Sequence, residues 1–108
     1  MFDLRWSQSE KRIARRLFDQ ALDCELTALI QETKARINQV STPDQLFKIQ
    51  DWLTSRRREI GETYDYRYSV LPLVFAKLLH RRLLSEDDLH GLSPEKVQLI
   101  RGLTRYRS

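Results

Sequence analysis

The stretch SEKRIARRLFDQALDCELTALIQETKARINQV, residues 9–40, decides the fold because neither glycine nor proline interrupts it. Apolar residues recur along it at helical spacing, which predicts one long α-helix. A helix of about 30 residues extends about 45 Å, farther than a domain this small covers by itself. Its second half carries a coiled-coil-like seam with 4-3-4-3 spacing, formed by Leu26, Ile30, Thr33, Ile37 and Val40. We therefore expect a homodimer in which a second copy of the chain covers this seam.

The start of the long helix carries a capping signal and an apolar face. Ser7 or Ser9 is the expected N-cap, and Glu10 supplies an acidic residue in the first turn. A broad apolar face follows and predicts contact with the core; it consists of Ile13, Leu17, Phe18, Ala21 and Leu22. Cys24 comes soon after, and we expect it to be a small buried residue.

A second helix is expected at about residues 43–60, folding back on the first. Thr42 is its N-cap, Pro43 suits the first helical position, and Gln45 completes a capping box. Gly61 is a suitable residue for the C-terminal stop. Leu46 of this helix joins the expected dimer interface with Leu26, Ile30, Ile37 and Val40.

A small helical cluster is expected at about residues 69–105. If Ser69 is the N-cap of its first helix, Pro72 lies in the first turn, where proline is tolerated. Ser85 starts a short helical turn, and Pro94 opens the last helix. The sequence therefore predicts a single all-α domain, residues 1–108, with a long helix, a returning helix and this cluster.

Composition and charge predict a cytoplasmic protein. Hydrophobic residues make up 41% of the chain and charged residues 31%, which is typical of a soluble protein. The longest apolar run, SVLPLVFAKLL at residues 69–79, is too short for a transmembrane segment and carries Lys77. The first residues lack the order of a signal peptide. A single cysteine, Cys24, fits a reducing compartment.

Motifs that carry chemistry are missing from the sequence. His80, His90 and Cys24 have no metal-ligand spacing, and there is no glycine-rich phosphate loop. We therefore expect no catalytic residue, no metal and no organic cofactor. The arginine clusters are interspersed with acidic residues, so we interpret them as solvated faces with local ion pairs. Nucleic-acid binding through these clusters is the less favoured interpretation.

The stretch DQLFKIQDWLTSRRREI, residues 44–60, places a large aromatic residue among polar ones. The apolar face of this helix consists of Leu46, Ile49, Leu53 and Ile60. Phe47 lies roughly 100–140° around the helix from the centre of that face. It either binds a partner protein or packs across the dimer seam, and one helix can serve both roles. Trp52, at the edge of the apolar face, is assigned to the core.

Three segments, in this order and spacing, carry a resemblance to a known family: WSQSE (6–10), DQLFKIQDWLTSRRREIGETYDYRYS (44–69) and VFAKLL (74–79). The chain resembles the fluorescence recovery protein family of cyanobacteria over most of its length. The resemblance implies a small, cofactor-free, antiparallel helical dimer. It implies binding of the light-activated red form of the orange carotenoid protein and a faster return to the orange form, which ends phycobilisome fluorescence quenching. It also implies a peripheral position at the cytoplasmic side of the thylakoid membrane.

The resemblance further implies a partner-binding patch on the second helix, made of Phe47, Gln50, Asp51 and Arg57. Asp51 and Arg57 match the family pattern. At Phe47 the family has Trp, and at Gln50 it commonly has His. Aromatic and arginine side chains are enriched at the energetic centres of protein interfaces. The alternative is a helical adaptor dimer with another protein client, and a small nucleic-acid-binding module comes third.

Overall fold

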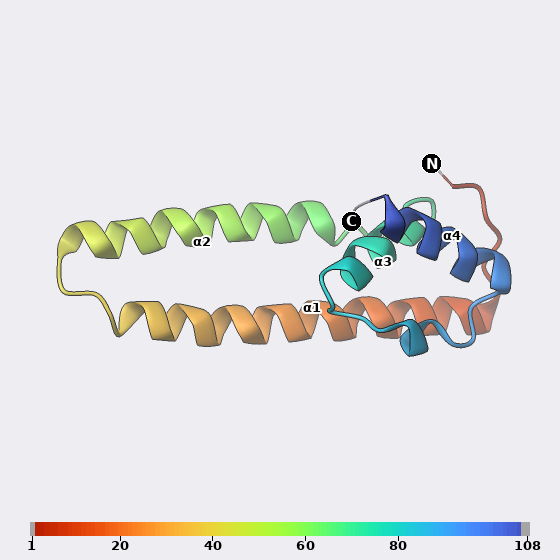
Figure 1. Ribbon diagram of the computed structural model, residues 1–108, viewed down its shortest axis with the longest axis horizontal. Coiled ribbons are helices and arrows are strands. Elements are labelled where there is room, and N and C mark those ends of the chain that lie inside the picture. The colour runs from red at the N-terminus through yellow and green to blue at the C-terminus, as the bar shows by residue number, and fades with distance from the viewer. Residues whose placement is uncertain (1, 107–108) are drawn as a thin grey trace.

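The computed structural model describes residues 2–106 and folds them as an all-helical protein (Figure 1). In chain order the elements are α1 (Gln8–Ile37), α2 (Pro43–Thr63), α3 (Leu71–His80), the 3-10 helix η1 (Glu86–Leu89) and α4 (Pro94–Arg105). The expected fold class is therefore confirmed, with a long first helix, a second helix that folds back and a helical C-terminal cluster. The molecule is elongated and measures 53 × 22 × 22 Å.

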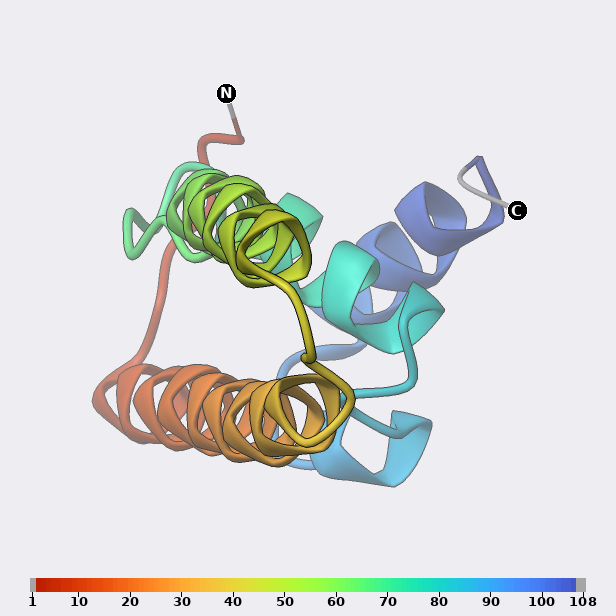
Figure 2. The same cartoon turned by 90° about the vertical axis from the view of Figure 1, so that its left-hand side faces the viewer.

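Helix α1 connects two regions of different character (Figure 1). The head, residues 2–21 and 64–106, contains the first part of α1 with α3, η1 and α4 packed against it. The arm, residues 22–63, contains the rest of α1 and the whole of α2, which run side by side in opposite directions. Figure 2 shows α1 and α2 as a stacked pair, with α3 and α4 displaced to one side.

The hydrophobic core lies entirely in the head. Its buried residues come from α1, α3, α4 and the segment between the last two: Ala14, Leu17, Phe18, Ala21, Leu71, Val74, Phe75, Ala76, Leu78, Leu84, Leu89, Leu92 and Ile100. Helix α3 is apolar on nearly every side because it lies between α1 and α4. The broad apolar face expected near the start of α1 does contact this core, with Ile13 and Leu22 at its edge.

A buried ion pair joins the start of α1 to the start of α4. The Glu10 carboxylate accepts hydrogen bonds from the backbone N–H groups of Ser7 (3.0 Å) and Ser93 (2.9 Å) and pairs with the Lys96 ammonium at 3.2 Å. Burial opposes ionisation of Glu10, but these N–H groups and Lys96 outweigh it and lower the pKa of Glu10 to about 2. Ser7 is the N-cap of α1, and Glu10 completes its capping box.

Two helix ends differ from expectation. The long helix was expected to reach about residue 40, but α1 ends at Ile37, and tight turn bonds place Val40 in the connection to α2. The second helix was expected to stop at Gly61, but α2 continues to Thr63. The Thr63 hydroxyl donates to the Glu59 carbonyl at 2.9 Å, and Thr63 is buried, so tertiary packing overrides the weak helix propensity of Gly61. The capping box of Thr42 and Gln45, with Pro43 in the first turn, is confirmed.

Three other expectations about single residues were wrong. The N-cap of α3 is Val70 rather than Ser69, because a turn beginning at Arg67 leads directly into the helix. Cys24 is exposed, since it lies beyond Ala21, the last residue of α1 that is buried in the core. Trp52 is half-buried outside the core, where the guanidinium of Arg36 lies 4.0 Å from its ring centre. Pro72 does lie in the first turn of α3.

Candidate functional site

The arm leaves most of its apolar side chains uncovered. Between residues 22 and 63 only Glu25 and Thr63 are buried, and neither is apolar. Five of its large apolar side chains are 41% to 59% exposed, and the others are half-buried; the exposed ones are Leu26, Ile30, Ile37, Leu46 and Phe47. A concentration of exposed apolar side chains on one region of a protein marks an interaction surface. The arm is therefore the candidate functional region.

An open groove of about 490 Å³ lies along α2 near the connection to α1. It is lined by Ile37, Leu46, Phe47, Ile49, Gln50, Leu53, Thr54 and Arg57. The lining from α2 recurs every three or four residues, so these side chains share one side of the helix. Phe47 is the most exposed of its apolar residues at 59%. The groove offers an aromatic anchor with a guanidinium close by.

The structure brings together three of the four residues expected to bind a partner. Phe47, Gln50 and Arg57 line the same groove, whereas Asp51 is exposed outside it. Asp51 and Arg57 are separated by about 120° around the helix. Among residues 2–106, no ion pair joins Asp51 to Arg57.

The residues expected at a dimer interface lie at three places along the arm. Ile37 and Leu46 line the groove. Leu26 and Ile30 are exposed farther back along α1. Val40 is half-buried in the connection and lines a separate depression with Arg36 and Lys48. The groove thus contains members of both predicted sets, as expected if one helix serves two contacts.

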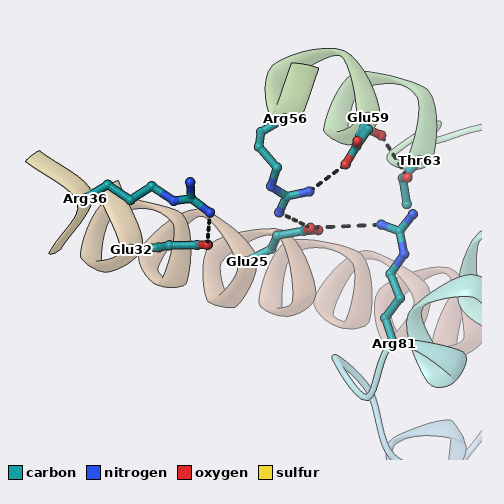
Figure 3. Close-up of polar contacts among 7 residues, drawn as sticks. All are labelled: Glu25, Glu32, Arg36, Arg56, Glu59, Thr63 and Arg81. Carbon is teal, nitrogen blue, oxygen red and sulfur yellow. Dashed lines mark hydrogen bonds and ion pairs between the residues drawn. The ribbon is translucent and has the colours of Figure 1, made fainter. Parts of the chain in front are cut away.

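A cluster of charged residues at the base of the arm was not foreseen from the sequence (Figure 3). The Arg56 guanidinium donates to the Glu25 carboxylate at 3.2 Å and to the Glu59 carboxylate at 2.8 Å. The Arg81 guanidinium lies 4.0 Å from the same oxygen of Glu25. The hydrogen bond that Arg56 donates to Glu59 contributes most to a raised pKa of Arg56, which burial opposes. No sequence signal reveals this cluster, because its members lie on segments that are far apart in the chain.

The described residues, 2–106, contain no group of three or more His, Cys, Asp and Glu side chains that could hold a metal ion. His80 ends α3 and His90 follows η1. Within the same range, no helix combines the length and the apolar character needed to cross a membrane.

A covered head and an arm of uncovered apolar and aromatic side chains define a helical protein-interaction module. Comparison with known proteins identifies the family. The chain belongs to the family of the photoprotection regulator fluorescence recovery protein, whose family model matches residues 6–104. The resemblance noted in the sequence is thereby confirmed.

The relatives are similar over nearly their whole length. The fluorescence recovery protein of Synechocystis sp. (strain PCC 6803) is 38% identical over 100 residues, which cover 93% of this chain and 92% of that protein. The solved structure of the Fremyella diplosiphon protein matches with a TM-score of 0.90 at 37% identity, covering 94% of this chain and 99% of that one. The Synechocystis structure matches with a TM-score of 0.90 at 38% identity and the same coverage.

Proposed function

We propose that this chain binds the photoactivated, red form of the orange carotenoid protein and accelerates its return to the orange form. The return ends fluorescence quenching at the phycobilisome. Such an effect needs no covalent chemistry. A protein that binds an intermediate conformation of its client more tightly than the starting conformation shifts the client population towards that intermediate. Membership of a family of photoprotection regulators supports the general role. The observation that carries the specific proposal is the exposed aromatic groove on α2.

The partner-binding residues in this proposal are Phe47, Gln50, Asp51 and Arg57. Phe47 is the anchor because a large exposed aromatic side chain gains most from being covered. Arg57 borders the same groove and fixes the orientation of an acidic or carbonyl group of the client. Gln50 adds a polar contact, and Asp51 binds from outside the groove.

The working form in this proposal is an antiparallel homodimer. Leu26, Ile30, Ile37, Val40 and Leu46 form its interface. The support is the arm itself, in which no apolar side chain between residues 22 and 63 is buried within one chain. Covering such side chains is the main source of stability in protein association.

Purified protein mixed with photoactivated orange carotenoid protein in the dark tests the function directly. The decay of the red absorption should accelerate with added protein and saturate at high concentration. The control is the same mixture with an unrelated small helical protein. A folded preparation that leaves the decay unchanged would overturn the proposal.

A helical adaptor with another protein client is the second candidate function. The observation that favours it is the pair of departures from the family pattern, Phe47 in place of Trp and Gln50 in place of the common His. Phe47→Trp separates the two candidates, since restoring the family residue should increase acceleration only if the client is the orange carotenoid protein.

The protein is further proposed to work without a metal or an organic cofactor. Elemental analysis and an absorption spectrum of the purified protein test this, and stoichiometric metal or a visible chromophore would contradict it. Its proposed place is the cytoplasm, at the periphery of the thylakoid membrane where the phycobilisome lies.

A further inference from the structure

Glu25 is the buried acidic residue of the arm, with 7% of its surface exposed. Its carboxylate lies at the point where three segments meet (Figure 3). From α2, the Arg56 guanidinium donates to Oε2 at 3.2 Å. From the end of α3, the Arg81 guanidinium lies 4.0 Å from the same oxygen. One carboxylate on α1 thus contacts both the arm and the head.

Tyr64 is a third neighbour of Glu25 and comes from the segment between α2 and α3. Burial, followed by the neighbouring Glu25 carboxylate, raises the pKa of Tyr64 well above its ordinary value, so its hydroxyl stays protonated. Tyr64 Oη and Glu25 Oε1 are both buried, and neither has a hydrogen bond of standard geometry to a described residue. A small side-chain adjustment would join them. Glu25 is thus bordered by two guanidinium groups and the Tyr64 side chain.

The apolar contacts of the arm hold α2 only in part. No apolar side chain is buried between residues 22 and 63, but Leu29, Leu53 and Ile60 are among those half-buried, so hydrophobic packing constrains the rotation of α2 less than it would in a closed core. Two polar contacts between the helices add to this packing. One is the Glu25–Arg56 pair, and the other is the stacking of Arg36 on Trp52 near the far end. The Glu25 pair is the better shielded from water, because its side chains are 8% and 24% exposed.

Because Arg56 and Arg57 are neighbours on one helix, the side of α2 from which Arg56 projects determines the side from which Arg57 projects. Successive positions on a helix are turned by about 100°. When Arg56 points at Glu25 on α1, Arg57 is turned away from Glu25 and lines the groove with Phe47. Rotation of α2 would move both groove residues together.

We infer that Glu25 is a positioning residue that fixes the rotation of α2 and thereby orients Phe47 and Arg57 for client binding. Arg81 links this position to the head. The part of the inference that concerns the client rests on the proposed function; the part that concerns α2 does not.

Hydrogen exchange measured by mass spectrometry tests the hold on α2 in the full chain. Glu25→Gln keeps the shape of the side chain and removes its charge, and exchange in the second half of α2 should rise roughly tenfold. Asp19→Asn is the matched control, because Asp19 is an exposed acidic residue on the same helix and pairs with Arg15 one turn earlier; Glu32 is unsuitable, since its partner in Figure 3 is Arg36, which stacks on Trp52. Head peptides should keep their protection in both variants, which shows that the fold survives. Unchanged exchange of α2 in Glu25→Gln would overturn the inference.

Arg56→Gln provides a second way to break the pair and should reproduce the exchange pattern. Arg81→Gln should change it less, because its guanidinium is farther from the carboxylate and 40% exposed. Equal protection of α2 in Arg56→Gln and in the wild type would also count against the inference.

A double-mutant cycle in the red-to-orange assay tests the link to client binding. If Glu25 acts by orienting Arg57, the losses of acceleration caused by Glu25→Gln and by Arg57→Lys should not add. If the two losses simply add, Glu25 does not act through Arg57, and the inference that Glu25 orients Arg57 for client binding is overturned. If the wild type does not accelerate the decay at all, the proposed function fails, and the role of Glu25 in holding α2 is decided by the exchange experiment.

Discussion

The head and the arm of this chain hold their helices together by different means. In the head, Phe75, Leu78 and Ile100 are fully buried between helices. In the arm, the helices are linked by the Glu25–Arg56 pair and the Arg36–Trp52 stacking, without a buried apolar side chain between residues 22 and 63. Hydrophobic stabilisation grows with the apolar area removed from water. The head therefore has the larger hydrophobic stabilisation within one chain, and we propose that the arm gains stability when another protein covers it.

The largest expected effect is on the stability of the head. Phe75→Ala removes a ring that is fully buried and leaves a cavity, which costs about 3–5 kcal/mol of unfolding free energy. The thermal midpoint should fall by more than about 10 °C in a circular dichroism melt. Ile30→Ala in the arm is the matched control, measured in the monomeric background of Leu46→Glu, and should cost about 1 kcal/mol or less. Equal losses would remove the distinction between the two regions.

The next effect concerns the oligomeric state. Leu46→Glu places a charge where the proposed interface buries a side chain that is 49% exposed in the single chain. An unpaired charge there should weaken a dimer by about a hundredfold or more. Light scattering at micromolar concentration should show a monomer for Leu46→Glu and for Ile37→Glu. Lys48→Glu, on the same helix, changes an exposed side chain and should remain dimeric. A monomeric wild type would contradict the proposal.

A third effect tests the polar link within the head. The pKa of Glu10 is lowered in the folded protein from 4.5 to about 2, so the unfolded chain binds its proton more readily than the folded one. The stability contributed by Glu10, up to about 3 kcal/mol, is complete above pH 4.5 and is lost as the pH falls towards 2. Urea unfolding at several pH values should show this decline. Glu10→Gln should flatten the dependence of stability on pH and be less stable at pH 7. If its stability fell with pH as steeply as that of the wild type, Glu10 would not be the group responsible for the decline.

A smaller effect is expected at the groove. Phe47→Ala should weaken client binding by about 2 kcal/mol, roughly thirtyfold, without lowering the melting temperature of the head. If Phe47→Ala also dissociates the dimer, Phe47 is part of the dimer interface. Phe47→Trp should increase the acceleration of the red-to-orange decay. If wild type and Phe47→Trp both fold, dimerise and leave the decay unchanged, the chain shares the family scaffold and serves another client.

The smallest effect is expected from conservative changes around Phe47. Arg57→Lys cannot reproduce a planar two-point contact and should lose about 1 kcal/mol of client binding. Asp51→Ala should also weaken client binding. Both side chains are exposed, so neither variant should change the melting curve or the dimer. A change in dimer mass in light scattering would show that these residues belong to the seam instead.

Helix starts were predictable from the sequence because their signals are local. Thr42, Pro43 and Gln45 act within one turn, and the structure has the expected capping box there. The end of α2 was not predictable in the same way. Gly61 resembles a stop signal, but the burial of Thr63 against the head carries the helix past it. Burial is a property of the assembled fold, and a local signal of about 1 kcal/mol does not resist it.

The candidate site was predictable only in part. Helical periodicity places Phe47, Gln50 and Arg57 on related positions of one helix, and the structure shows them lining one groove. Periodicity also separates Asp51 from Arg57 by about 120° around the helix, in agreement with its position outside the groove. Periodicity does not reveal that Ile37 of α1 completes this groove, because that depends on how α2 is rotated against α1.

The sequence by itself determined the all-helical fold, the starts of α1, α2 and α4 and the unusual position of Phe47, because these follow from spacing and capping within a few residues. Only the tertiary structure decided which part of α1 is covered. It also decided that Cys24 and Trp52 lie outside the core, and that Glu25 meets Arg56 and Arg81. Such contacts join residues separated by 31 positions or more, and their energies depend on burial and distance, which no local pattern encodes.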